Sequence, residues 1–306
     1  MRLFFCADND VAAGRDLHVR SMTTLVAGTF ELDLAMPCVM GILNVTGDSF
    51  SGDGRLDHAA AIAHGRAMLR DGARIVDVGG ESTRPGAAPV DEAEELRRVI
   101  PVIEALAAEG ACVSVDTMKP SVMREAIAAG ASMINDVNAL QTPGAVGVAA
   151  ASNSAVCLMH MQGEPATMQT APAYADVVTE IRAFLQRRAS ACIDAGIDRR
   201  GIVVDPGIGF GKTPAHNLAL LRRLDALAAL GFPLLVGISR KATLGLITGR
   251  EVGERAAASV AAALAAAVRG ARILRVHDVR ETVDALAVWN AIEPWPASSP
   301  SRNTEQ

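Results

Sequence analysis

The chain repeats one pattern eight times: a short apolar run, then a longer segment with helical periodicity. The apolar runs lie at 38–43, 75–78, 111–115, 133–134, 155–159, 202–204, 234–238 and 273–276. Segments between them, such as 91–108, 177–195 and 255–269, carry apolar residues every three or four positions, as amphipathic helices do. Strand followed by helix, eight times over, predicts an α/β fold of the (β/α)8 TIM-barrel type. A doubly wound parallel sheet is the alternative, but it usually has fewer such units.

Both ends of the chain lie outside this repeat. Residues 1–21 show no periodicity, and we expect a mobile N-terminal extension there. Segment 23–34 alternates weakly around Gly28, which predicts a short hairpin under the barrel. Residues 295–306 are rich in Pro and Ser, and we expect a disordered tail. The pattern therefore predicts one barrel domain over 22–294.

Composition narrows the class of protein. The sequence has 29 Lys and Arg against 34 Asp and Glu, a net charge of −5, and it contains no basic tract. This balance argues against a nucleic-acid or membrane partner. Half of the residues are hydrophobic, but aromatic residues are few, so we expect an aliphatic core under Ala-rich helices.

The cysteines and the lengths of the apolar segments indicate the cellular compartment. The five cysteines are odd in number and none has metal-ligand spacing, so we expect free buried thiols and a reducing compartment. The apolar run at the N-terminus is too short for a signal peptide, and the Ala-rich stretch 256–268 is too short to cross a bilayer. We therefore expect a cytoplasmic protein.

Polar residues follow every apolar run. They are Asn44, Asp77, Asp116, Asn135, His160, Asp205, the segment 239–241, and Arg275 with His277. Active sites of barrels form at the carboxyl ends of the strands, so we expect one site from this set. Asp or Asn after a strand is often only a turn residue or helix cap, but that interpretation does not account for the cationic members.

The chemistry of this set is mixed. Lys241, Arg275 and His277 suit a substrate that carries phosphate or diphosphate. Asp116, Asn135 and Asp205 suit an aromatic heterocycle with amino and lactam edges, because carboxylates accept two N–H groups and an amide pairs donor with acceptor. A single small molecule with both features would match the whole set.

The glycine-rich segment 205–213 looks like a phosphate-binding P-loop, but its spacing excludes that motif. Three residues separate Gly207 from Gly211, where a P-loop needs four between its glycines. We expect these glycines to let the backbone approach a flat ligand, with Phe210 nearby; a plain glycine turn is the alternative. His160 lies between two methionines, and we favour a structural role for it over a catalytic one.

Eight ordered motifs resemble the dihydropteroate synthase family. They are MGILNVTGDSF (40–50), DVGGESTRPGA (77–87), SVDTMKP (114–120), INDV (134–137), LMHMQG (158–163), DPGIGFGKT (205–213), GISRK (237–241) and RVHDV (275–279). The resemblance implies a transferase that condenses a 6-hydroxymethyl-dihydropterin diphosphate with p-aminobenzoate in folate biosynthesis. It also implies Mg²⁺ as cofactor, inhibition by sulfonamides, and a homodimer built on the later helices.

The resemblance also implies roles for individual residues. Those for the pterin are Asp116, Asn135, Met159, Asp205, Gly209, Phe210, Lys241 and Arg275, of which Asp116, Asp205 and Lys241 would be catalytic. Those for the diphosphate are Asn44, Thr83, Arg275 and His277, with Asn44 as ligand to the metal. Those for p-aminobenzoate are Phe50, Arg84, Pro85, Ser239, Arg240 and Lys241.

The first loop departs from the family pattern, because Gly47 stands where the family has Pro and the order at 52–54 is Gly-Asp-Gly. Two other functions compete with the synthase. A methyltransferase that serves a corrinoid would share the heterocycle contacts but would not need Lys241, or Arg275 with His277. An inactive paralogue acting as a binding subunit is supported only by the altered first loop.

Overall fold

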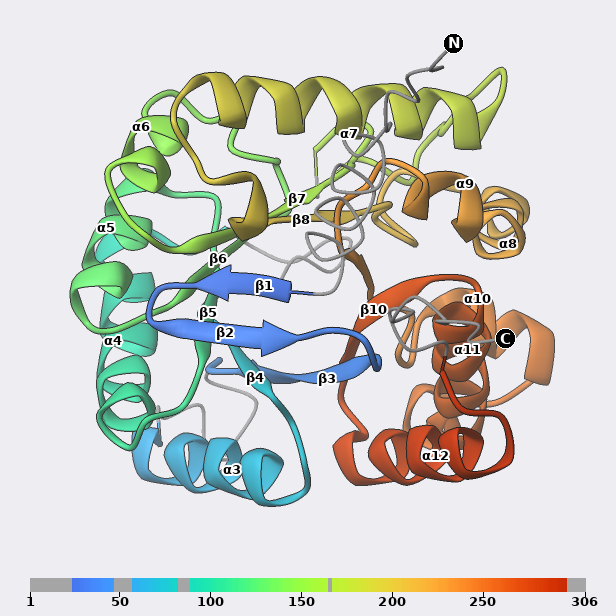
Figure 1. The fold of residues 1–306 in the computed structure, drawn as a ribbon, viewed down its shortest axis with the longest axis horizontal. Coiled ribbons are helices and arrows are strands. Elements are labelled where there is room, and N and C mark those ends of the chain that lie inside the picture. The colour runs from blue at the N-terminus through green and yellow to red at the C-terminus, as the bar shows by residue number, and fades with distance from the viewer. Residues whose placement is uncertain (1–23, 47–56, 82–88, 165–166, 296–306) are drawn as a thin grey trace, which may run out of the picture.

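The computed structural model describes residues 24–46, 57–81, 89–164 and 167–295. Eight parallel strands form a closed barrel in the order β10-β3-β4-β5-β6-β7-β8-β9, with helices on the outside (Figure 1). The strands are β3 (Cys38–Asn44), β4 (Ile75–Gly79), β5 (Val113–Asp116), β6 (Met133–Asp136), β7 (Ala155–Met159), β8 (Ile202–Asp205), β9 (Leu234–Val236) and β10 (Ala271–Val276). Every predicted run contributes one strand, so the TIM barrel is confirmed and the doubly wound sheet is excluded.

Helices fill the segments between the strands. They are α3 (His58–Arg70), α4 (Glu92–Ala108), α5 (Pro120–Ala128), α6 (Ala145–Ala150), α7 (Val177–Asp194), α8 (Pro214–Arg222), α9 (Leu224–Ala228), α10 (Ala242–Thr248), α11 (Ala256–Val268) and α12 (Val279–Ile292), with 3-10 turns η1 (Arg199–Gly201) and η2 (Val252–Glu254). Side-chain caps fix two of the predicted starts, because Asp91 and Asp176 each accept a hydrogen bond from a first-turn N–H at 2.8 Å. The three helices predicted from periodicity are therefore confirmed.

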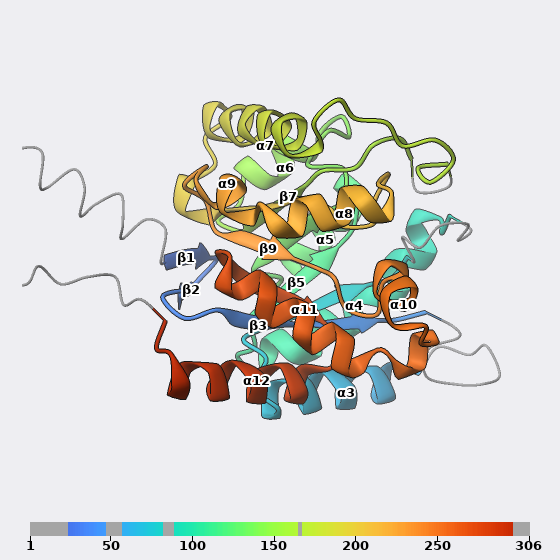
Figure 2. The same cartoon turned by 90° about the vertical axis from the view of Figure 1, so that its right-hand side faces the viewer.

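A hairpin of β1 (Thr24–Ala27) and β2 (Phe30–Asp33) closes the amino-terminal end of the barrel. Its turn uses Gly28 at φ +60°, a conformation that favours glycine. The inward side chains of the hairpin, Leu25 and Leu32 among them, pack against strand residues such as Met40. Figure 2 shows this hairpin at one end of the barrel, and its predicted position is confirmed.

The remaining core lies between the strands and the helices and is mostly aliphatic. Four cysteines, Cys38, Cys112, Cys157 and Cys192, are buried and free, as expected. The packing continues to Trp295, which is buried beside Trp289, although this position was assigned to the predicted tail. Across the described ranges, none of the helices combines the length and apolarity needed to cross a bilayer.

Candidate active site

The predicted polar residues meet at the carboxyl ends of the strands. Asn44 ends β3, Asp116 ends β5 and Asp205 ends β8. The register places Asp116 directly beside Asn135 on β6, and Met159 of β7 beside Asp205. Parallel pairing thus brings residues that are far apart in the sequence to one rim, as the barrel architecture requires.

Arg275 binds two carboxylates at the centre of this rim. Its Nε donates to Asp77 Oδ2 and its Nη2 donates to Asp116 Oδ2, both at 2.6 Å. The Arg275 side chain comes from β10, and Asp77 and Asp116 come from β4 and β5. Charge-assisted pairs of this length, at side chains withdrawn from water, fix the guanidinium firmly in place.

Asp77 was expected at this rim, but it is the member of this group to which the sequence assigned no substrate. It is completely buried, and its Oδ2 also accepts a hydrogen bond of 3.0 Å from Asn135 Nδ2. Its Oδ1 has no hydrogen-bond partner in the described structure. The signal was present in the sequence, because one acidic residue interrupts the apolar run at 75–78 and must be buried there with a partner.

Burial and neighbouring charges shift the titration of this cluster. Desolvation raises the pKa of Asp116 to about 7, with Arg275 acting against the rise and Asp77 adding to it. Desolvation lowers the pKa of the Arg275 guanidinium, but the charges of Asp77 and Asp116 outweigh it and raise that pKa above its usual value. Asp116 therefore titrates in the neutral range while Arg275 stays charged.

Lys241 follows β9 and faces the glycine-rich segment after β8. Its ammonium lies 4.6 Å from the centre of the Phe210 ring and hydrogen-bonds the carbonyl oxygen of Ile208. Desolvation lowers the pKa of Lys241 to about 8, while the charge of Asp205 opposes the shift. Asp205 accepts a 2.7 Å hydrogen bond from Gly207 N, and desolvation raises its pKa. The structure thus joins the predicted residues Asp205, Phe210 and Lys241.

The glycines of this segment allow a close contact between two loops. A Cβ on Gly207 would stand 2.0 Å from the carbonyl oxygen of His160, and a Cβ on Gly211 would stand 2.3 Å from that of Gln162. Both have positive φ. Gly207 and Gly211 therefore lie in close contact with the loop after β7. Gly209, at φ +84°, instead lies against the Lys241 side chain.

Ser239 and His277 lie together, although the resemblance assigned them to different substrates. The Ser239 hydroxyl is 3.0 Å from His277 Nδ1, and its oxygen accepts from the His277 backbone N–H at 3.2 Å. Arg240 has a left-handed backbone at φ +57°, which is uncommon for a residue with a side chain, and its guanidinium is paired with Asp278. The neighbouring sites predicted for p-aminobenzoate and diphosphate thus share one wall.

The oxygens near Asn44 fit a magnesium ion held mainly by a substrate diphosphate. Gly79 lies between Asn44 and Asp116, and a Cβ on it would stand 3.8 Å from both Asn44 Oδ1 and Asp116 Oδ2. The described residues contain no cluster of three or more His, Cys, Asp or Glu able to hold a metal by itself. Mg²⁺ typically takes one or two protein oxygens and completes its shell with phosphate and water, and Asn44 suits that arrangement.

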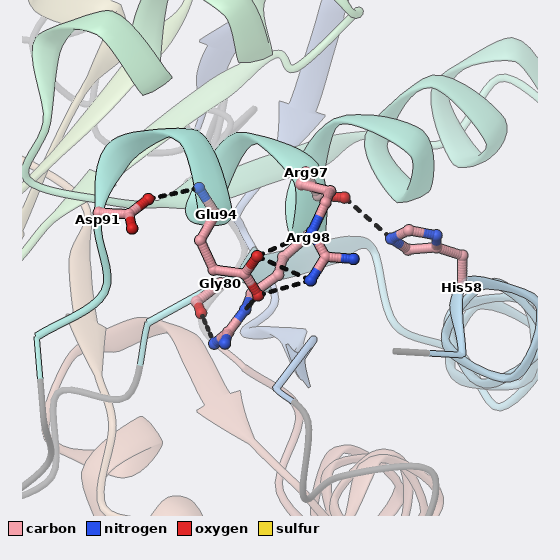
Figure 3. A network of polar contacts seen from close by, with 6 residues as sticks. All are labelled: His58, Gly80, Asp91, Glu94, Arg97 and Arg98. Carbon is pink, nitrogen blue, oxygen red and sulfur yellow. Dashed lines mark hydrogen bonds and ion pairs between the residues drawn. The ribbon is translucent and has the colours of Figure 1, made fainter. Parts of the chain in front are cut away.

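A polar network on α4 holds the end of β4 (Figure 3). Arg98 donates to the carbonyl oxygen of Gly80 at 2.8 Å and is itself bound by Glu94 at 2.7 Å. The next residue, Glu81, is paired with Lys119. Lys119 also binds Glu95, which is almost completely buried. No local pattern in the sequence indicated this support, which links the ends of two neighbouring strands.

Some predicted site residues lie outside the described structure. These are Phe50 in the first loop, and Thr83, Arg84 and Pro85 after β4. The altered first-loop positions, Gly47 and 52–54, also lie outside it.

Comparisons with known proteins agree with this geometry. The sequence profile of the family described as pterin binding enzyme matches residues 40–277. A dihydropteroate synthase of Escherichia coli K12 is 50% identical over 272 residues, which cover 88% of this chain and 96% of the relative.

Solved structures give the same result. The Xanthomonas albilineans dihydropteroate synthase with 4-aminobenzoic acid is 53% identical, with a TM-score of 0.85 over 90% of this chain and 100% of that one. The Yersinia pestis dihydropteroate synthase with a sulfonamide drug complex is 49% identical, with a TM-score of 0.84 over 88% of this chain and 98% of that one. The chain therefore belongs to the dihydropteroate synthase family of pterin binding enzymes.

Proposed function

We propose that this rim condenses 6-hydroxymethyl-7,8-dihydropterin diphosphate with p-aminobenzoate to give 7,8-dihydropteroate and diphosphate. The protein is a transferase of folate biosynthesis, as its relatives at about 50% identity are. The single observation that carries the proposal is the cluster of Arg275 with Asp77 and Asp116 beside Asn135. In this cluster, carboxylates and an amide that can bind a heterocycle lie next to a cation that can bind a diphosphate.

The pterin ring is recognised by acceptors at the strand ends. Asp116 and Asp205 accept N–H groups of the ring edge, and Asn135 pairs with its lactam. Lys241 lies beside Asp205 and over Phe210, which places a cation at one side of the slot. The remaining residues proposed to line the slot are Met159, Gly209 and Arg275. Buried polar groups of this kind reject analogues that lack the matching edge.

Loss of diphosphate begins the reaction. Arg275 and His277 neutralise the leaving charge, with Asn44 and Thr83 as further contacts. Mg²⁺, when bound at Asn44, supplies additional neutralisation of that charge. Departure leaves a cation at the pterin methylene carbon, delocalised into the ring and stabilised by the nearby Asp116 carboxylate. The neutral amine of p-aminobenzoate then attacks that carbon and loses its proton, so no covalent enzyme intermediate forms.

The second substrate is proposed to bind against the loop after β9. Ser239 and Lys241 lie on this side of the rim, and Arg240 is held between them by Asp278. Phe50, Arg84 and Pro85 complete the assigned set. The 4-aminobenzoic acid and sulfonamide named for the two solved relatives support both the substrate and the inhibitor class.

We also propose a cytoplasmic homodimer. Apolar side chains are exposed on the two helices that flank α11: Leu246 and Ile247 on α10, and Val288 and Ile292 on α12. Exposed apolar side chains on these helices favour contact with a second copy. The four buried free thiols suit a reducing compartment.

The direct test is an assay with dihydropterin diphosphate, p-aminobenzoate and Mg²⁺ that follows dihydropteroate. We expect product, and we expect EDTA to stop its formation while free 6-hydroxymethylpterin still binds. Binding of the pterin diphosphate without product would favour the inactive paralogue, and absence of both would overturn the assignment of the rim. Methyl transfer to a corrinoid in place of condensation would favour the competing methyltransferase.

A further inference from the structure

Lys212 lies in the glycine-rich segment 205–213 and has no part in the function proposed above. Its side chain is almost completely buried, with a residue exposure of 2%. Its ammonium lies 2.8 Å from the carbonyl oxygen of Phe210, 3.2 Å from that of His160, and 3.0 Å from His160 Nδ1. An ammonium group has three N–H donors, so these three acceptors satisfy it completely.

The three acceptors belong to two different loops. His160 directly follows Met159 at the end of β7, and Phe210 belongs to the segment after β8. Both Met159 and Phe210 are proposed to line the pterin slot. The Phe210 ring faces the Lys241 ammonium while its carbonyl oxygen faces Lys212. Phe210 lines one side of the slot and Met159, at the end of β7, lines the other. Lys212 therefore holds the backbone of Phe210 to the residue that follows Met159.

The surrounding contacts make the two loops one rigid unit. The missing Cβ atoms of Gly207 and Gly211 allow the segment after β8 to touch the backbone of the other loop. The Tyr174 hydroxyl donates to the carbonyl oxygen of Gly211 at 2.8 Å. The His160 ring packs edge-on against Phe184, with 4.9 Å between the ring centres. Lys212 is the polar tie within this unit; burial lowers the pKa of its ammonium to about 7, while the charge of Asp205 opposes that shift.

The electrostatics of the pair fix the state of His160. Burial lowers the pKa of His160 to about 3, and the charge of Lys212 acts in the same direction. The imidazole therefore stays neutral, with Nδ1 as acceptor and the proton on Nε2. This agrees with the structural role favoured for His160 from the sequence.

We propose that Lys212 is a positioning residue for the pterin: its ammonium binds His160 and Phe210 together and so sets the pterin slot between Met159 and Phe210. The inference rests on the proposed function, since it assumes that this slot holds the pterin. It gives a role to the lysine of a segment whose spacing excludes a P-loop.

The first test uses the protein without substitution. Nitrogen NMR of the histidine side chains is expected to show His160 as a neutral Nε2–H tautomer that does not titrate between about pH 5 and pH 8, outside the range of an ordinary histidine. A His160 resonance that titrates near its ordinary pKa would overturn the contact with Lys212. This measurement stands even where a variant fails to fold.

The second test measures binding of 6-hydroxymethylpterin by calorimetry. Lys212→Met keeps the length of the side chain and removes its charge, and we expect the Kd to rise about tenfold or more, as small misplacements in a site do. The KM for p-aminobenzoate should change less than the Kd of the pterin, since Lys241 is the described residue of that site that contacts the segment after β8. Arg199→Met is the matched control, because Arg199 also donates to a backbone carbonyl, that of Gly231, but at the opposite end of the barrel.

Substitutions of the partner provide a rescue test. His160→Leu removes the acceptor and should weaken pterin binding as Lys212→Met does, whereas His160→Asn places an amide oxygen close to the former Nδ1 and should restore most of the affinity. A folded Lys212→Met protein that binds the pterin with unchanged Kd would overturn the inference. Failure of the unsubstituted protein to bind the pterin would instead overturn the proposed function.

Discussion

Arg275 and Asp116 stand 159 positions apart in the sequence, and 2.6 Å separates Arg275 Nη2 from Asp116 Oδ2. Asp77 holds the other side of the same guanidinium through Nε. The charge proposed to bind the leaving diphosphate is thus tied to the carboxylate proposed to bind the pterin. Any change at Asp77 should reach both substrate groups through Arg275.

Asp77→Asn tests this coupling. The Asp77 charge raises the pKa of Asp116, so its removal should lower that pKa and move the acidic limb of the kcat/KM profile to lower pH. The variant should also lose about 3 kcal/mol of stability, as expected when one partner of a buried ion pair is removed. Denaturant unfolding and the pH dependence of pterin turnover measure the two effects. Asp198→Asn is the control, because it removes an exposed ion pair with Arg200 and keeps an amide oxygen that can still accept from the Arg200 backbone N–H. An unshifted acidic limb would contradict the coupling.

The unsubstituted protein should show a bell-shaped kcat/KM for the pterin diphosphate. Asp116 loses its proton as the pH rises through about 7, and Lys241 loses its proton as the pH rises through about 8. The rate constant should therefore climb toward neutral pH, where the carboxylate forms, and fall in mildly alkaline solution, where the ammonium is lost.

Substitution separates the two limbs of this profile. Asp116→Asn should remove the acidic limb and reduce kcat/KM by about 10²-fold, and Lys241→Ala should remove the alkaline limb with a loss of similar size. Steady-state rates across pH measure both. A variant of near-normal activity that keeps both limbs would remove its residue from the mechanism.

Arg275→Ala should discriminate between two ligands. The Kd of the pterin diphosphate should rise about 10²-fold, because the cation proposed to bind the diphosphate is lost, while binding of free 6-hydroxymethylpterin should weaken far less. Calorimetry with each ligand measures the difference. Arg275→Lys keeps the charge but not the forked guanidinium. Its Kd for the pterin diphosphate should lie between those of the unsubstituted protein and Arg275→Ala. Equal losses for both ligands would mean that Arg275 does not bind the diphosphate.

The fold was predictable from the sequence because its signals are local. Each buried parallel strand reads as an apolar run, and each helix as a periodic segment with a cap such as Asp91. The rim followed from the architecture alone, because strand ends in a parallel barrel converge. An acidic residue at the end of a strand can also be only a turn residue, and Asp136 is an example. Its two carboxylate oxygens accept hydrogen bonds from the backbone N–H groups of Asn138 and Leu140 and close a turn.

The pairing of side chains was not predictable in the same way. Asp77 was predicted to lie at the rim, but no local rule joins it to Arg275, 198 positions away. The glycines at 207 and 211 indicated close approach, but not that the approached surface is the loop after β7. Long-range contacts depend on the register of distant strands, which one sequence does not display.

The last prediction concerns Gly47 in the first loop. Gly47 stands where the family has Pro, and a glycine has more backbone conformations than a proline to lose when one of them is fixed on binding p-aminobenzoate. The penalty for such a replacement is on the order of 1 kcal/mol at most. Gly47→Pro should therefore lower the KM for p-aminobenzoate by up to about fivefold and leave the Kd of the pterin unchanged. Steady-state kinetics at saturating pterin diphosphate measures the change, and an unaltered KM would show that the loop does not need the family's Pro.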